Sequence, residues 1–150
     1  MYEIYTDGAY MSSIKCGGCA AIIFKDGKIV KKLYQGYKNT TNNRMEMMGV
    51  LMALEYFDSP EILTIYSDSA YVVNSINLGH VHKWFETKDY SKKNLDLWFK
   101  IIDLLSFHNV KFIWVKGHAN NKGNCMADLY SVHSCTCLNL PTDLNETDKN

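Results

Sequence analysis

Three strand-like segments follow one another at the start of this chain, and their short connections limit the fold more than any other feature. Residues 2–9 are β-prone, residues 19–24 form an apolar run, and residues 29–37 follow the hairpin signal Asp26-Gly27. Neighbouring strands joined by turns this tight pair in opposite directions. The sequence therefore predicts an antiparallel meander of three strands at the amino terminus.

Helices and strands alternate in the rest of the chain. The polar stretch 40–43 offers several helix N-caps, and Ser59-Pro60 stops the helix that follows. Residues 80–93 are polar, aromatic and irregular. The predicted elements are helix 45–57, strand 62–66, helix 70–78, an amphipathic helix capped by Asn94, strand 110–115 and helix 124–134. A meander followed by this alternation predicts an α/β fold, in which helices flank a mixed sheet.

Composition indicates a single domain and gives no strong hint of a partner. The 150 residues are 47% apolar, which suffices for one core within residues 1–138, followed by a disordered polar tail at 139–150. No apolar run approaches a bilayer span and the first residues are no signal peptide, so we expect a cytoplasmic protein without membrane contact. Because the net charge is zero, attraction to phosphate must come from a local patch or from bound metal.

The five cysteines, an odd number without a secretory signal, favour reduced thiols in the cytosol. Cys16 and Cys19 have the CxxC spacing, and Cys135 and Cys137 form a CxC pair near the tail. Together these four thiols could hold a structural zinc ion. Small reduced cysteines in a turn and at a frayed terminus are the simpler interpretation.

Four acidic residues draw attention because of their local settings: Asp7, Glu46, Asp68 and Asp128. Asp7 and Asp68 fall at or just after the ends of expected strands, where ligands of open α/β sheets gather. A turn would also explain Asp7, and helix N-capping would also explain Asp68. Carboxylates that meet in one place repel each other. Convergence of the four would therefore indicate a divalent cation.

Glu46 and Asp128 are harder to explain by structure alone. On its expected helix Glu46 lies at the start of the apolar face rather than on the solvated face, and a carboxylate buried there needs a partner. An ion pair with Arg44, the only arginine in the chain, is the structural alternative. Asp128 lies inside an expected helix, where capping does not account for it, and His118 lies on a loop after a strand.

Six short motifs occur along the chain. They are Thr6-Asp7-Gly8, Thr41-Asn42-Asn43-Arg44-Met45-Glu46, Ser67-Asp68-Ser69-Ala70-Tyr71-Val72, Asn94-Leu95-Asp96-Leu97-Trp98, Val115-Lys116-Gly117-His118 and Ala127-Asp128. In order and spacing they resemble the type-one ribonuclease H family (ribonuclease HI-like) over roughly residues 2–134. The resemblance implies a ribonuclease H-like fold: a five-stranded mixed sheet, its first three strands antiparallel, with helices on both faces. It also implies an endonuclease that hydrolyses the RNA strand of RNA–DNA hybrids.

The resemblance also implies a role for each acidic residue. Asp7, Glu46, Asp68 and Asp128 would hold two Mg²⁺ ions, with Asp7 bridging them and Mn²⁺ as a possible substitute. Magnesium suits oxygen-only ligands and accepts substrate phosphate in its shell. One ion would activate water and the other would stabilise the departing 3′ oxygen, which leaves 5′-phosphate and 3′-hydroxyl ends. His118 would assist proton transfer or product release.

Substrate-binding residues follow from the same resemblance. Asn42 and Asn43 would reach the 2′-hydroxyls of the RNA strand in its shallow minor groove, and Thr41 would help to hold a phosphate of the DNA strand. Residues 80–93 match the family's basic handle for the hybrid. Its contact residues would be Lys83, Trp84, Lys88, Lys92 and Lys93. The handle is shorter than fuller versions and the first loop departs from the family pattern, so we expect weaker, more salt-sensitive binding.

Three other functions fit parts of the sequence. A non-catalytic hybrid-binding module could use the same fold, but it would not need four carboxylates and His118. A resolvase or integrase core acting on DNA shares the carboxylates without the block at 42–46. The third is a zinc-stabilised adaptor built on the cysteines. The proximity of Met1 to the first strand and the polar tail favour a free-standing enzyme over a piece of a larger polymerase polypeptide. We also expect the enzyme to be a monomer.

Overall fold

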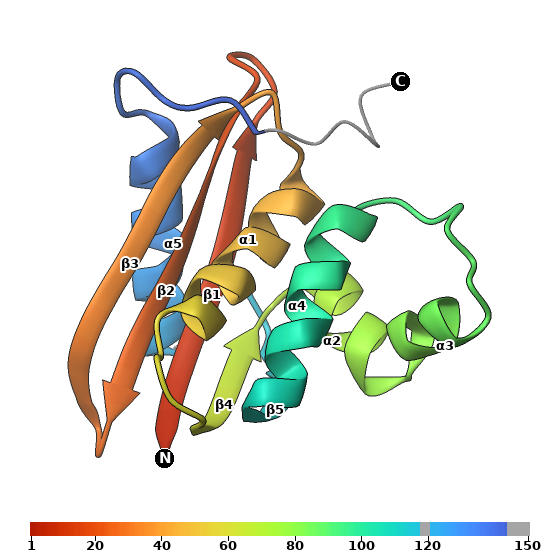
Figure 1. Ribbon diagram of the computed structural model, residues 1–150. Helices are drawn as coiled ribbons and strands as arrows, with labels where there is room; N and C mark the ends of the chain where they lie inside the picture. Colours follow the sequence, from red (N-terminus) through yellow and green to blue (C-terminus); the bar gives the residue numbers. More distant parts are fainter. Residues whose placement is uncertain (118–120, 144–150) are drawn as a thin grey trace.

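A five-stranded mixed sheet forms the centre of the computed structural model, which describes residues 1–117 and 121–143 (Figure 1). The strand order is β3-β2-β1-β4-β5, with β1, β2 and β3 antiparallel and with β4 and β5 parallel to β1. The strands are β1 (Tyr2–Met11), β2 (Cys16–Lys25), β3 (Lys28–Lys38), β4 (Ile62–Ser67) and β5 (Asn109–Trp114). The predicted meander is confirmed. Asp26 and Gly27 turn it with positive φ angles of 52° and 76°, as a two-residue hairpin requires.

Helices cover both faces of the sheet. They are α1 (Asn42–Glu55), α2 (Ala70–Asn77), α3 (His80–Glu86), α4 (Leu95–Phe107) and α5 (Lys122–Cys135). Figure 1 shows α1 and α4 in front of the sheet and α5 behind β1, β2 and β3. On the α5 side, a Cβ atom at Gly18 would lie 2.0 Å from the carbonyl oxygen of Ser131, so only glycine permits this approach of helix and strand. The predicted α/β class with flanking helices is confirmed.

The main core lies between the sheet and the front helices. Helix α1 is buried on most of its surface because it packs on β1 and β2 and is covered by α4. A Cβ atom at Gly49 would lie 3.0 Å from the carbonyl oxygens of Asp7 and Ala20, which fixes how closely α1 approaches the sheet. Trp98 of α4 is fully buried, and its indole nitrogen donates to the Tyr71 hydroxyl at 3.2 Å. Each large apolar side chain buried here stabilises the fold by roughly 1.5–3 kcal/mol.

The region 80–93, predicted to be irregular, contains a helix. Val81 is fully buried, and Trp84 and Phe85 pack against the core, so the apolar side chains follow the three- and four-residue spacing of a helix face. The ring of Phe85 stacks on Phe99 of α4 with centroids 4.6 Å apart. The prediction missed α3 because its apolar face spans only two turns.

The prediction of a disordered tail is wrong for residues 141–143, which contact the sheet. The amide of Lys38 donates to the carbonyl of Pro141 at 2.8 Å, and the amide of Asp143 donates to the carbonyl of Lys38 at 2.9 Å. The Asp143 side chain is 4% exposed and pairs with Arg44. Buried ion pairing and backbone hydrogen bonds therefore order residues 141–143. Residues 144–150 of the expected tail lie outside the described residues.

Among the described residues, no helix is both long and apolar enough to cross a lipid bilayer.

Candidate active site

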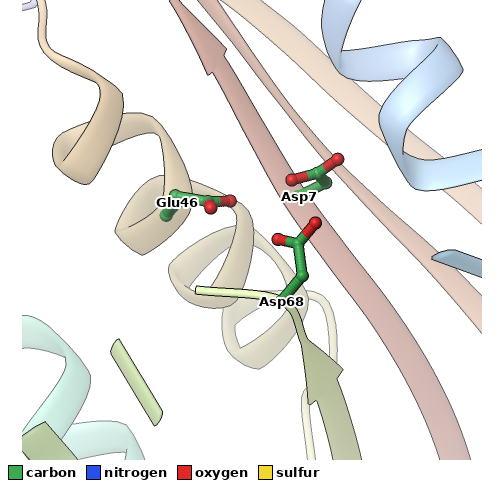
Figure 2. Close-up of side chains that lie close together, drawn as sticks. All are labelled: Asp7, Glu46 and Asp68. Atoms are coloured by element: carbon green, nitrogen blue, oxygen red, sulfur yellow. The ribbon is translucent and has the colours of Figure 1, made fainter. Parts of the chain in front are cut away.

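Three carboxylates from distant parts of the chain meet at one place in the fold. Asp7 lies on β1, Glu46 on α1 and Asp68 directly after β4, and one oxygen of each lies within 4.8 Å of the others. Figure 2 shows Glu46 and Asp68 both directed toward Asp7. Three of the four acidic residues singled out in the sequence therefore converge.

Asp7 lies within β1 rather than at its end, which corrects the expected strand boundary. β1 continues to Met11 because it stays paired with β2, where Asp7 faces Ala20. The parallel partner β4 ends earlier, with Ser67 opposite Thr6. Asp7 thus lies where the parallel pairing of β1 with β4 stops, and Asp68 comes directly after the end of β4. The site therefore lies at the carboxyl end of the parallel pair β1 and β4, where ligands of open α/β sheets bind.

The close approach of α1 to β1 brings Glu46 to Asp7. A Cβ atom at Gly8 would lie 2.3 Å from the backbone nitrogen of Glu46, so a larger residue would push the helix away. Thr41 begins the helix, since its Oγ1 accepts from the amide of Arg44 at 3.2 Å. Glu46 then falls in the second helical turn and is 6% exposed. Glycine at position 8 therefore sets the geometry of the site.

Ser69 caps α2, which removes the capping interpretation of Asp68. The Ser69 hydroxyl accepts from the amide of Val72 at 3.2 Å. Gly117 approaches the Asp68 carboxylate instead, since a Cβ atom there would lie 2.8 Å from Asp68 Oδ2. The loop after β5 therefore contacts the site. His118, the next residue, lies outside the described residues.

Arg44, the suggested partner of Glu46, binds two other carboxylates. Its Nε donates to Asp143 at 2.7 Å, and its NH1 and NH2 each donate to Asp96 at 2.9 Å. Burial opposes the charge on Arg44, but hydrogen bonds to Asp143 and Asp96 outweigh burial and raise the pKa of the guanidinium. The position of Glu46 is therefore not explained by a structural pair with Arg44.

Burial and mutual repulsion weaken the acidity of the cluster. Burial, followed by the charge of Asp68, raises the pKa of Asp7 from 3.8 to about 7. Burial and the neighbouring charge of Asp7 likewise raise the pKa of Glu46 well above its ordinary value. Without a cation the site retains protons at neutral pH, which is a common sign of a functional carboxylate cluster.

The donor set fits a hard divalent cation. Glu46 Oε1 is buried and has no hydrogen-bond partner among the described residues, which is costly unless another group binds it. Asp7, Glu46 and Asp68 offer oxygen atoms only, as Mg²⁺ and Mn²⁺ prefer. The three residues are therefore able to hold such a cation.

Asp128 lies near this group but is not one of the three. It is half-buried on α5, and its charge contributes to the raised pKa of Asp7. One turn earlier, Asn124 is 2% exposed, and its Oδ1 has no hydrogen-bond partner among the described residues. The sequence analysis did not single out Asn124, because an asparagine near a helix start is ordinarily a cap. Here Asn121 is the cap, and its Oδ1 accepts from the amide of Asn124.

A hollow of about 350 Å³ lies beside the first turn of α1. It is lined by Thr41, Asn42, Asn43, Lys93 and Asn94. All three predicted contact residues at the helix start therefore meet Lys93, the last residue of the predicted handle. Polar atoms and one cation around an open hollow suit a phosphate or sugar group.

The handle is anchored by its aromatic residues. Lys92 Nζ lies 5.7 Å from the centroid of the Trp84 ring, and Trp84 packs against the core. Lys83 and Lys88 are exposed. Trp84 therefore anchors the handle to the core, and Lys83 and Lys88 remain accessible to a ligand.

Comparison with known proteins decides the family. The family model described as RNase H matches residues 1–136. The chain belongs to the ribonuclease H family. It is 41% identical over 146 residues to a Ribonuclease H of Trichodesmium erythraeum, covering 94% of this chain and 92% of the relative. It is also 41% identical to the Ribonuclease HI of a Synechocystis species over 135 residues, covering 86% and 84%.

Solved structures of the ribonuclease H family have the same fold. One is LC9-RNase H1, described as a type 1 RNase H with the type 2 active-site motif; it matches with a TM-score of 0.80 at 24% identity, covering 89% of this chain and 71% of that one. The amino-terminal RNase H domain of rv2228c from Mycobacterium tuberculosis matches with a TM-score of 0.69 at 20% identity, covering 89% and 92%. The resemblance seen in the motifs is confirmed, and the chain is a metal-dependent endoribonuclease of this ribonuclease H family.

The cysteines of this ribonuclease H do not gather as zinc ligands in the described part of the chain. The group of three or more potential ligands found there consists of carboxylates alone. Cys19 Sγ donates to the carbonyl of Gln35 at 3.4 Å, and Cys135 Sγ donates to that of Val132 at 3.0 Å. Burial raises the pKa of Cys19 to about 12, so its thiol stays protonated. These contacts support the simpler interpretation of reduced structural thiols.

The carboxylate cluster predicts how the stability of the metal-free protein depends on pH. The folded pKa of Asp7 is raised from 3.8 to about 7, and that of Glu46 is raised as well. A raised carboxyl pKa contributes stability below the unfolded pKa, and this stability is lost as the pH rises through the folded pKa. We expect the melting temperature in chelator to fall by on the order of 5 °C between pH 4.5 and pH 8.

Thermal unfolding in buffers of equal ionic strength measures this dependence. Saturating Mg²⁺ at pH 8 should recover the lost stability, because a ligand that binds only the folded state stabilises it. A metal-free melting temperature that rises steadily from pH 4.5 to pH 8 would contradict the prediction.

Proposed function

We propose that this chain hydrolyses the RNA strand of RNA–DNA hybrids with two Mg²⁺ ions, leaving 5′-phosphate and 3′-hydroxyl ends. The convergence of Asp7, Glu46 and Asp68 around a buried carboxylate oxygen without a partner is the observation that supports it most. Bound magnesium would activate the attacking water and neutralise charge on the leaving oxygen. Membership of the ribonuclease H family makes this the reaction to test first.

The chain's own residues supply the positions for this reaction. Asp7, Glu46 and Asp68 surround a common space, with one oxygen of each within 4.8 Å of the others, and in the proposal Asp7 would help to hold both ions. Asp128 on α5 completes the ligand set in the proposal. In the proposal, the imidazole of His118 would assist proton transfer or product release.

Hybrid recognition would use the hollow at the start of α1. Asn42 and Asn43 offer amide donors and acceptors suited to the 2′-hydroxyls of RNA. Thr41 and Lys93 line the same hollow and suit a backbone phosphate. The exposed lysines of the handle, Lys83 and Lys88, would neutralise further phosphates, so affinity should fall with salt.

Cleavage of a labelled RNA–DNA hybrid in magnesium tests the proposed function. RNA duplex and DNA duplex serve as substrates that should stay intact. Asp68→Asn should reduce cleavage by at least about a hundredfold, since a metal ligand supports several kcal/mol of transition-state stabilisation. Asp58→Asn is the matched control, because Asp58 is exposed beyond the opposite end of α1. It should cleave like the wild type.

The two main outcomes separate the candidate functions. Cutting of the RNA strand in the hybrid alone, lost in Asp68→Asn, supports both the chemistry and the substrate. Tight hybrid binding without any cutting in magnesium or manganese would overturn the hydrolase and favour a non-catalytic hybrid-binding module.

A further inference from the structure

The segment after α5 returns to the start of α1. Besides the two backbone hydrogen bonds with Lys38, Thr142 forms a parallel bridge with the same residue at the end of β3. This segment lies beyond residue 136, where the match to the family model ends. Figure 1 shows it crossing from α5, behind the sheet, to the end of the sheet where α1 begins.

The Asp143 carboxylate holds the chain on both sides of the substrate-contact residues. Its Oδ2 accepts from Thr40 Oγ1 at 2.8 Å and from Arg44 Nε at 2.7 Å, and its Oδ1 accepts from Arg44 NH2 at 2.9 Å. Thr40 precedes the contact residues 41–43, and Arg44 follows them. One buried carboxylate, 103 residues from Thr40 in sequence, therefore fixes both ends of this short stretch.

Arg44 links the same carboxylate to the opposite wall of the hollow. Its NH1 lies 3.5 Å from Asn94 Oδ1, and Asn94 lines the hollow with Lys93. The Asn94 side chain is itself held, since its Nδ2 donates to the Tyr71 hydroxyl at 3.1 Å. Charge-assisted hydrogen bonds in a buried network are strong and directional. The network thus sets the separation between residues 41–43 and the pair Lys93 and Asn94.

We propose that Asp143 is a positioning residue for hybrid binding, which acts by holding Thr40 and Arg44 so that residues 41–43 face Lys93 across the hollow. The inference rests on the proposed function, because it assigns the hollow to the hybrid. Asp143 itself does not contact the substrate. Its loss lets the α1 start move relative to Lys93, which weakens binding of the hybrid backbone more than it changes the chemical step.

Asp96 provides a control for the structural contribution of Asp143. Asp96 also pairs with Arg44, but it does so from α4 and through the NH1 and NH2 edge of the guanidinium. Asp143 uses the Nε and NH2 edge and also binds Thr40. Asp143→Ala and Asp96→Ala each remove one carboxylate from the same arginine. Only Asp143→Ala also releases Thr40.

Steady-state cleavage of the hybrid tests the inference, together with hybrid affinity measured without divalent metal. We expect Asp143→Ala to raise KM and the dissociation constant by at least about fivefold, with kcat changed by less than about twofold. Asp96→Ala should leave KM and the dissociation constant within about twofold of the wild-type values, even if its melting temperature falls as far as that of Asp143→Ala. Thr40→Val keeps the Arg44–Asp143 pair and should reproduce part of the KM effect, so it gives a result even if Asp143→Ala does not fold.

Equal KM values for folded Asp143→Ala and Asp96→Ala, or an unchanged KM in Thr40→Val, would overturn the positioning role. A wild-type chain that binds the hybrid without cutting it would refute the proposed reaction, while the affinities of the variants would still decide the role of Asp143. A wild-type chain that does not bind the hybrid would overturn both.

Discussion

Replacement of Asp7 by asparagine should lower the rate of hybrid cleavage by about 10⁴-fold while making the metal-free protein more stable above pH 7. Asp7 meets both Glu46 and Asp68, and in the proposed reaction it would help to hold both cations, so its loss should affect both. The same carboxylate is costly to ionise in the folded state, because burial raises its pKa to about 7. Asparagine removes that cost, and the trade of stability for activity is typical of active sites.

Two measurements on the same preparation check this prediction: single-turnover cleavage in magnesium and thermal unfolding at pH 8 in chelator. Asp26→Asn is the control, because Asp26 is an exposed turn residue with a φ of 52° that asparagine adopts readily. It should change neither quantity. An Asp7→Asn protein that cleaves within about tenfold of the wild type would refute a central role for Asp7.

The sequence was sufficient for the elements that depend on local patterns. The β-prone and apolar segments and the Asp26-Gly27 turn predicted the meander. The expected strand ends near Asp7 and Asp68 predicted the edge where the site forms, although Asp7 itself lies within β1. Glu46 was informative because a carboxylate on an apolar helix stripe has few structural explanations. The structure weakens the structural alternatives for two residues. Arg44, the suggested partner of Glu46, binds Asp96 and Asp143, and Ser69 rather than Asp68 caps α2.

Long-range contacts account for what the sequence did not predict. No local pattern marks Asp143 as buried, because its partners Thr40 and Arg44 lie 103 and 99 residues away. A polar segment after the last helix looks disordered until such a partner is known. In the same way, α3 depends on packing of Trp84 and Phe85 against the core rather than on its own short sequence. Both features border the hollow or carry the handle, so tertiary contacts shape the proposed substrate surface.

Replacement of Arg44 by methionine is expected to lower the free energy of unfolding by about 3–5 kcal/mol, because it leaves the buried carboxylate of Asp143 without its cation. For a chain of this size the melting temperature should fall by about 10 °C or more. Arg44→Lys keeps the positive charge but lacks the planar guanidinium that donates to Asp143 and Asp96 along two edges. It should therefore lose clearly less stability than Arg44→Met.

The pH dependence of this loss identifies its cause. Arg44 favours the ionised form of Asp96: although partial burial acts to raise the pKa of this carboxyl, hydrogen bonds from Arg44 outweigh burial and lower it. A lowered pKa contributes stability above the unfolded value, and this stability is lost as the pH falls through the folded pKa. In Arg44→Met the half-buried Asp96 loses these hydrogen bonds and is more easily protonated, so the stability gap to the wild type should be largest near pH 7 and should narrow toward pH 3. A gap of the same size at both pH values would mean that Arg44 stabilises the fold by packing its side chain rather than by its charge.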